Sequence, residues 1–355
     1  MSWPATRLLD LFGIGVPIVQ APMANFAGVD MAIAVAEAGG LGALPCAALD
    51  PSQIRDGVTA FRACTRQPLN CNFFCHIEAP QDIAKDRAWL ERIAPYFAEL
   101  GVEAPTLPLP QGHPPFGEAD CAAVEALRPE VVSFHFGLPP GPLLARVKAT
   151  GCKIISTATS VREARDLAAR GIDAVIAQGA EAGGHRGMYL ETDVATQTGT
   201  FALVRNMSAA VEIPVIAAGG MADGRAVAAA LTLGASAVQI GTAYLLCPES
   251  MASALHKAAL ADDARETAIT DVLTGRPARG VVNRFMRDQG PLDAAAPAFP
   301  RARPAIAPLR TKAEAAGCTD FSPLWSGQAA KLSRGVGAGE LTRKLAQEAL
   351  AYLTV

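Results

Sequence analysis

The chain has 355 residues, of which 50% are hydrophobic and 18% are charged, so it can bury a large core in one or two domains. The formal net charge of −3 and the lack of a basic stretch interleaved with aromatic residues argue against a nucleic-acid partner. The N-terminal residues show no signal-peptide pattern, and no run reaches the roughly 18 apolar residues of a membrane span, so we expect a cytoplasmic protein without a membrane partner.

The cysteines and histidines indicate neither a disulfide framework nor a metal site. None of the eight cysteines forms a CxxC pair, and most lie in apolar runs, where a free thiol behaves as a small hydrophobic side chain. The five histidines lack metal-ligand spacing such as HExxH. We therefore predict a protein of a reducing compartment with no bound metal.

Short apolar runs typical of buried strands alternate along the chain with stretches typical of helices. The predicted strands cover residues 17–22, 41–44, 68–74, 131–136, 153–158, 173–177, 214–218 and 237–240. Helix signals lie between them, such as the capping box of Ser160 and Glu163. Strands separated by helices predict a parallel α/β architecture. Eight of them favour a closed (β/α)8 barrel of TIM type over an open doubly wound sheet.

Two regions break this alternation and suggest a second structural unit. Residues 78–129 hold charged helical segments and a proline-rich passage, which is too long for an ordinary connection and indicates an insertion. The chain after 245 is helical in pattern, apart from an irregular stretch rich in Pro and Ala at 291–310. We predict a barrel over residues 1–245 with that insertion, and a mainly helical region over 246–355 that forms a smaller lid domain and packs back on the barrel.

The most distinctive stretch is the glycine-rich loop at 177–187, which follows the sixth predicted strand and contains His185 and Arg186. Glycine has no Cβ, so the backbone can approach a bound molecule closely, and histidine places a titratable ring beside it. An ordinary surface loop with an incidental histidine is the alternative. Active sites of TIM barrels gather at the C-terminal ends of strands, which favours the functional interpretation. Arg186 could orient an anionic substrate or form an ordinary surface ion pair.

Glycines after the last two predicted strands indicate a phosphate site. Gly219-Gly220 precedes a helix that Asp223 can cap, and Gly241-Thr242 precedes a helical run. Backbone N–H groups at these places, aided by a helix N-terminus, commonly hold phosphate in such barrels. Neither a GxGxxG fingerprint after a strand nor a GxxxxGK[ST] loop occurs. The sequence therefore predicts a phosphorylated ligand at the barrel mouth.

Two amide side chains at strand ends are candidates for contact with that ligand. Asn72 and Gln178 each offer donors and an acceptor, which match the mixed edge of an isoalloxazine pyrimidine ring. They could equally close off the barrel mouth with internal hydrogen bonds. The residues alone leave both interpretations open.

These motifs together resemble the nitronate monooxygenases, of the bacterial class I type. The resemblance is carried by residues 20–24, 70–76, 132–137, 177–187 and 239–249, and it extends from about residue 6 to about residue 330. It implies FMN bound in a (β/α)8 barrel with a smaller domain. It also implies oxidation of alkyl nitronates of the propionate 3-nitronate type by O2 to a carbonyl compound and nitrite.

The resemblance further implies roles for single residues. His185 would be the catalytic residue at the reactive face of the flavin, and His135 and Met23 would line the substrate pocket. The cofactor-binding residues would be Met23, Asn72, Gln178, Gly183, Gly220, Gln239, Ile240, Gly241 and Thr242. One departure is Asn25-Phe26, where relatives often have glycine, and it bears on the shape of the pocket near the flavin.

Two other functions stay open at this point. One is an FMN-dependent NAD(P)H:quinone or enoyl-thioester reductase on the same barrel, and the other is a non-redox phosphate-binding barrel such as an isomerase or aldolase. The latter would need a strand-end lysine for Schiff-base chemistry, which is missing. The expected partners are a nitronate or nitroalkane and O2, and the chain would act as a monomer or homodimer. His185 could remove a proton from a neutral nitroalkane. A nitronate arrives deprotonated, and toward it His185 could stabilise a charge.

Overall fold

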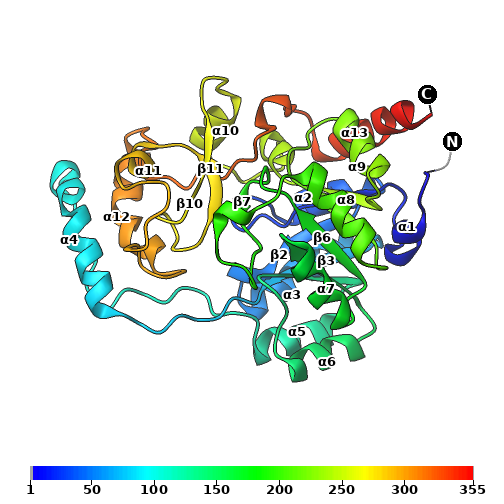
Figure 1. The fold of residues 1–355 in the computed structure, drawn as a ribbon, viewed down its shortest axis with the longest axis horizontal. Coiled ribbons are helices and arrows are strands. Elements are labelled where there is room, and N and C mark those ends of the chain that lie inside the picture. Colours follow the sequence, from blue (N-terminus) through cyan, green and yellow to red (C-terminus); the bar gives the residue numbers. More distant parts are fainter. Residues whose placement is uncertain (1–2, 355) are drawn as a thin grey trace.

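Eight parallel strands form a barrel at the centre of the computed structural model, which describes residues 3–354 (Figure 1). They are β1 (Ile18–Gln20), β2 (Gly42–Pro45), β3 (Leu69–Phe74), β4 (Val131–His135), β5 (Lys153–Ala158), β6 (Ala174–Gln178), β8 (Val215–Ala218) and β9 (Ala237–Ile240). Their order is β1-β9-β8-β6-β5-β4-β3-β2, and a bridge between Val19 and Leu41 joins the two ends. The predicted (β/α)8 barrel is confirmed.

Helices surround the barrel and cover its outer face. They are α2 (Val29–Glu37), α3 (Pro51–Cys64), α5 (Glu118–Leu127), α6 (Gly141–Ala149), α7 (Val161–Ala169), α8 (Thr200–Ala210), α9 (Gly224–Thr232) and α13 (Ala338–Leu353). Local caps define several of their starts: Asp50 and Gln53 form a capping box at α3, and Asp223 accepts from the Ala226 N–H at α9. The largest hydrophobic cluster lies between these helices and the strands.

The N-terminal end of the barrel is filled with apolar side chains. Helix α1 (Arg7–Phe12) contributes Leu8, Leu9 and Phe12 to a buried cluster. The strand residues in this cluster are Val19, Leu41, Val131, Ile155, Ala174, Ile176, Ile216, Ala218 and Ala237. Because this end is closed by packing, a ligand can enter only from the C-terminal ends of the strands.

A second cluster lies beside the barrel and is built mainly from the later part of the chain. It includes α4 (Ile83–Leu100), α11 (Arg284–Asp288) and α12 (Ala302–Ala315), and it is flanked by a three-stranded antiparallel sheet of β10 (Thr267–Thr270), β11 (Ala278–Val281) and β7 (Gly184–His185). Figure 1 shows α4 and α12 at the left, away from the barrel. The remaining elements are α10 (Ala254–Ala261) and the 3-10 helices η1 (Cys46–Ala48), η2 (Val194–Thr196), η3 (Thr242–Leu246) and η4 (Ala330–Leu332).

The second cluster supports a division of the chain that we propose here. Of the segment at 78–129, α4 packs on α12, whereas α5 packs on the barrel helices α3 and α6. At the other end of the chain, α13 packs on α9 and α2 of the barrel. We propose a smaller domain made of α4 and the region from β10 through α12, with α5 and α13 belonging to the barrel.

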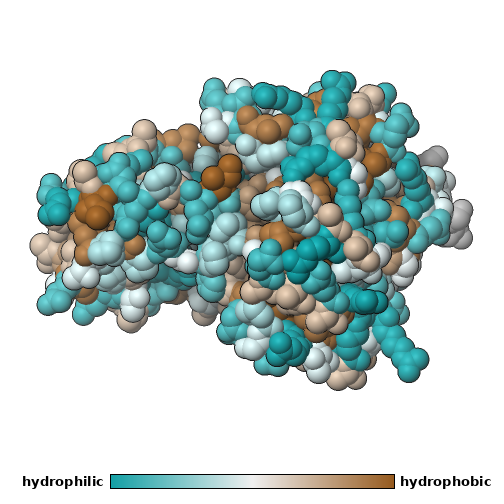
Figure 2. Space-filling view, turned by 90° about the horizontal axis from the view of Figure 1, so that it is seen from below, coloured by the Kyte–Doolittle hydropathy of each residue, from teal (hydrophilic) through white to brown (hydrophobic). Residues whose placement is uncertain are grey.

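The surface is mostly hydrophilic on the face that Figure 2 shows, with scattered small hydrophobic patches. Within residues 3–354, no helix combines the length and apolar character that crossing a membrane requires. Isolated apolar side chains such as Ile77 and Phe201 are exposed, which is common on folded proteins.

Candidate active site

Polar side chains point into the barrel at the C-terminal ends of its strands. Alternation along β3 and β4 places Asn72 beside Ser133, and the Asn72 Nδ2 atom donates to the Ser133 carbonyl (3.2 Å) and hydroxyl (2.9 Å). One strand further, His135 Nδ1 lies 3.0 Å from the Thr157 hydroxyl. The barrel mouth is therefore polar above an apolar floor.

Some buried polar atoms on the barrel strands have no partner among the described residues. Gln239 on β9 has a buried Oε1 without a hydrogen bond, and both side-chain atoms of Asn70 on β3 are in the same state. A buried amide without a partner is costly, so such atoms mark places where a ligand can be bound.

The glycine-rich loop is fixed in place by pairing with β11. Residues Gly184–His185 form β7, which pairs with β11 so that His185 lies opposite Ala278. Gln178 clamps the loop from the barrel side, because its Nε2 donates to the His185 carbonyl (2.9 Å) and its Oε1 accepts from the Gly187 N–H (2.7 Å). His135 Nε2 also donates to the His185 carbonyl, at 3.2 Å. The internal hydrogen bonds expected as one option for Gln178 are therefore present.

Arg186 has a different role from either of the two expected for it. Its side chain is fully buried, and its guanidinium donates to the carbonyls of Gly179 (2.8 Å) and Gln178 (2.6 Å) and to Gln197 Oε1 (3.0 Å). Burial lowers the pKa of Arg186 to about 10, which leaves it charged at neutral pH. The surface ion pair is wrong, and one donor on each of the three guanidinium nitrogens bonds to protein atoms instead of a substrate.

His185 lies in an aromatic pocket whose side chains come from the barrel and from the later part of the chain. Its ring is 5.3 Å from Phe299, 5.4 Å from Trp325 and 6.0 Å from Phe136, measured between ring centroids. Its Nε2 atom is 3.0 Å from the hydroxyl of Thr274. Burial, together with neighbouring positive charge, lowers the pKa of His185 to about 3, so the ring is neutral at neutral pH.

The pocket around His185 is positive in electrostatic character. The guanidinium carbon of Arg276 lies 4.0 Å from the centre of the Phe136 ring. The guanidinium donates to the Met188 carbonyl, and its buried Nε has no partner among the described residues. Phe136 itself has a φ of 71°, which non-glycine residues adopt rarely. The groups that carry positive charge near His185 at neutral pH are Arg276 and Arg303, and both disfavour a cation on its ring. This pocket therefore favours an anion.

A glycine cradle lies at the ends of β8 and β9. Gly219 and Gly220 have φ values of 116° and 70°, and a Cβ on Gly241 would come within 3.3 Å of Ala21 and 3.8 Å of the Met23 sulfur. In the described part of the chain, the N–H groups of Gly220 and Gly241 donate no backbone hydrogen bond. Free N–H groups on backbone without side chains are what a phosphate group requires.

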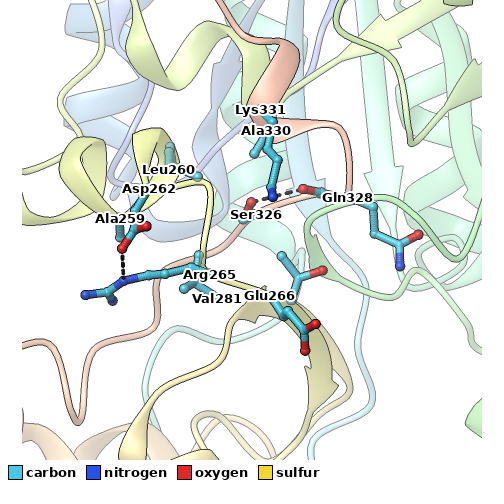
Figure 3. Close-up of a pocket in the computed structure, with 12 residues that line it drawn as sticks. Ala259, Leu260, Asp262, Arg265, Glu266, Val281, Ser326, Gln328, Ala330 and Lys331 are labelled. Carbon is cyan, nitrogen blue, oxygen red and sulfur yellow. Dashed lines mark hydrogen bonds and ion pairs between the residues drawn. The ribbon is translucent and has the colours of Figure 1, made fainter.

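A segment from the far end of the chain covers this cradle. The Gly327 N–H donates to Thr242 Oγ1 (2.9 Å), and a Cβ on Gly183 would lie only 2.5 Å from the Gly327 nitrogen. The same segment forms one wall of a surface pocket of about 310 Å³, drawn in Figure 3, which Arg265 and Lys331 also line. Gln328 projects from this wall (Figure 3), and its N–H donates to the Glu181 carbonyl (3.0 Å). The sequence-predicted residues of the loop and the cradle thus lie around one barrel mouth.

Several residues of this site were missed by the sequence analysis. Thr274, Arg276, Phe299 and Trp325 all come from the predicted lid region, and nothing in their local pattern distinguishes them from loop residues. The available signal was Gly275. A Cβ added at this position would lie 2.2 Å from the Pro297 carbonyl oxygen, so the glycine marks a close backbone approach. No group of three or more His, Cys, Asp or Glu side chains within residues 3–354 could hold a metal ion.

Comparison with known proteins gives a consistent result. A family model described as nitronate monooxygenase matches residues 5–348. A nitronate monooxygenase from Pseudomonas aeruginosa is 43% identical over 351 residues, which covers 96% of this chain and 98% of that protein.

Two solved structures extend the likeness to three dimensions. A nitroalkane oxidase from Streptomyces ansochromogenes has a TM-score of 0.89 and 38% identity, and the match covers 98% of this chain and 99% of that one. FabK from Thermotoga maritima has a TM-score of 0.74 and 28% identity, with coverage of 99% and 98%.

Proposed function

The chain belongs to the nitronate monooxygenase family and is an oxidoreductase of that family, and we propose that it uses FMN and O2 to oxidise alkyl nitronates of the propionate 3-nitronate type to a carbonyl compound and nitrite. The observation that carries the proposal is the neutral His185 in a positive pocket at the barrel mouth. Such a pocket suits an anionic substrate and lies beside a cradle suited to phosphate.

The residues at the barrel mouth fit FMN. Gly220 and Gly241 offer free N–H groups for the phosphate, beside the Thr242 hydroxyl. Gln239 has an unpartnered Oε1, which suits the polar groups of a flavin or its ribityl chain. In this proposal Asn72, Gln178, Gly183, Ile240 and Met23 would also contact the cofactor. FMN supplies the electron transfer from nitronate to O2, and the protein supplies position and electrostatics.

Arg276 supports the assignment of an anionic substrate. Its guanidinium is stacked on Phe136 in the same pocket as His185, and its Nε has no partner among residues 3–354. Burial lowers the pKa of Arg276 to about 10, so it remains a cation at neutral pH, and Glu163 is the one carboxylate that acts on it. A buried cation of this kind stabilises the two oxygens of a nitronate through charge-assisted hydrogen bonds.

His135 has a supporting part in this proposal. Both of its ring nitrogens are within hydrogen-bond distance of protein atoms, the Thr157 hydroxyl and the His185 carbonyl. It would therefore line the substrate pocket as a rigid wall and hold the loop that carries His185. We also propose a cytoplasmic enzyme, monomer or homodimer, in line with the free thiols of its eight cysteines.

The visible spectrum of the purified protein tests the proposal. We expect a flavin spectrum that is bleached by propionate 3-nitronate without O2, and only slowly by NADH or NADPH. Rapid full reduction by a nicotinamide would instead support a reductase, and a colourless protein that FMN cannot reconstitute would contradict both. The variant His185→Asn should keep the flavin, since the loop is held through the His185 carbonyl, but lose about 10²-fold or more in turnover of neutral nitroalkanes.

A further inference from the structure

The hydroxyl of Thr274 makes two contacts in a rigid setting. Its Oγ1 atom lies 3.0 Å from His185 Nε2 and 3.2 Å from the carbonyl oxygen of Arg276. Thr274 is 5% exposed, and the next residue, Gly275, has a φ of 87° and packs against the backbone of residues 297–299. The hydroxyl oxygen is therefore held at one position relative to the histidine ring.

These two contacts determine which nitrogen of His185 carries the proton. The geometry has Thr274 donating its single hydroxyl proton to the carbonyl oxygen of Arg276, which can only accept. Toward His185 the same hydroxyl oxygen can then only accept, which requires a hydrogen on Nε2. A neutral imidazole carries one N–H, so Nδ1 is left with a free lone pair.

We propose that Thr274 is a positioning residue that holds His185 in the Nε2–H tautomer, so that Nδ1 is the atom that takes a proton from a neutral nitroalkane. This inference rests on the proposed function for its substrate. The C–H bond next to the nitro group breaks, its proton goes to Nδ1, and its electron pair remains on the substrate as the nitronate. The proton leaves for solvent after turnover.

The surroundings of the ring agree with this assignment. Nδ1 is not bonded to any of the described residues, whereas Nε2 is. Burial and the charge of Arg276 disfavour an isolated imidazolium, which keeps the lone pair on Nδ1 available before substrate binds. When the proton moves, an anion forms beside the new cation, so the two charges compensate each other inside the pocket.

The second histidine of the pocket gives a natural control. His135 Nε2 faces the His185 carbonyl oxygen, which accepts only, so its tautomer is set by a backbone atom. Its Nδ1 faces the Thr157 hydroxyl at 3.0 Å. Removing the Thr157 hydroxyl should therefore leave the tautomer of His135 unchanged, whereas removing the Thr274 hydroxyl should change that of His185.

Nitrogen NMR of the full-length protein tests the proposal directly. With ¹⁵N-labelled histidine, the wild type should show His185 with a protonated Nε2 and an unprotonated Nδ1, assigned by the loss of these signals in His185→Asn. Thr274→Ser should keep this pattern, Thr274→Val should shift it toward the Nδ1–H form, and Thr157→Val should leave the His135 pattern as it is. A protonated Nδ1 in the wild type, or an unchanged His185 pattern in Thr274→Val, would overturn the proposal.

Kinetics separate this inference from the proposed function. Thr274→Val should lower kcat for neutral nitroalkanes by about 10-fold or more and leave oxidation of preformed nitronates within about twofold, with Thr274→Ser close to wild type. Equal losses with both substrate forms would contradict the positioning role. If the wild type fails to oxidise nitronates at all, the proposed function is wrong, while the tautomer is still decided by the NMR signals.

Discussion

Arg186 and Arg276 show how the same residue type takes opposite roles within one site. Arg186 is satisfied by backbone carbonyls of its own loop, so its charge stabilises the fold of that loop. Arg276 keeps a buried Nε without a partner in the pocket of His185. Sequence alone could not separate them, because a charged residue in a loop is most often at the surface, and only the folded loop brings carbonyls around Arg186.

Replacing Arg276 tests whether the pocket selects anions. The variant Arg276→Met keeps an unbranched side chain for packing on Phe136 but removes the charge. Because a hydrogen bond to a charged group contributes about 1.5–3 kcal/mol, we expect KM for nitronates to rise by about 10-fold or more. Arg276→Lys is the matched control and should recover part of the affinity. An equal rise in KM for neutral nitroalkanes would show that Arg276 acts through structure and not through charge.

At the scale of elements, the sequence predicts the eight barrel strands to within a residue or two of their observed ends. Parallel strands buried on both faces appear as continuous apolar runs, and helices between them carry capping signals, so both leave a clear local pattern. The strand β7 has only two residues, and β10 (Thr-Ala-Ile-Thr) and β11 (Ala-Arg-Gly-Val) lack the continuous apolar run of the barrel strands. The pairing of β7 with β11, which fixes His185, therefore could not be predicted from local sequence patterns.

The cradle at the ends of β8 and β9 can be tested through Gly220. Its φ of 70° strains any other residue, and a Cβ there would come within 3.4 Å of Glu181 Cβ, so a branched side chain would displace the turn. We expect Gly220→Val to weaken FMN binding by at least about 10-fold. The cause is about 1–2 kcal/mol of backbone strain, together with displacement of the Gly220 N–H group from the phosphate.

The matched control for this prediction is Gly151→Val, measured by fluorescence titration of FMN into the apoprotein. Gly151 also has a positive φ, of 83°, but a Cβ there would meet no atom within 4 Å. It should lose stability through the same strain and keep its affinity for FMN. If both variants bind FMN as tightly as the wild type, Gly220 is not part of the phosphate site.

At the scale of the whole molecule, the buried histidines couple stability to pH. Burial lowers the pKa of His185 and of His135 to about 3, and that of His76 to about 4, whereas an unfolded histidine titrates near 6.5. Between these values the unfolded chain binds more protons than the folded one, so the free energy of unfolding falls as pH falls from about 6.5 toward 3.

Urea unfolding at several pH values measures this coupling. We expect a loss of about 1–3 kcal/mol between pH 7.5 and pH 5, where few carboxylates titrate. His76→Gln should make the dependence less steep, because its buried ring has no hydrogen-bond partner in the described chain, and the exposed His113→Gln should not change it. A free energy of unfolding that is constant over this range would contradict the prediction.

Which segments form each of the two proposed domains could be predicted only in outline. The helical pattern after 245 indicated a smaller unit, but the contacts of α4 with α12 and of α13 with α9 join segments more than a hundred residues apart. Such contacts depend on the shapes of assembled surfaces, which no local pattern contains. For the same reason Thr274 and Trp325 could be assigned to the site only once β11 was seen beside β7.

The pairing of β7 with β11 ties the loop that carries His185 to the smaller domain that we propose. The barrel carries His185, but the partner strand β11 and the Thr274 hydroxyl come from the smaller domain. Any movement that parts the domains to exchange ligands would also release the histidine from its alignment. In the mechanism that we propose, proton abstraction by His185 therefore depends on contacts from both parts of the chain, and separating them would suspend it.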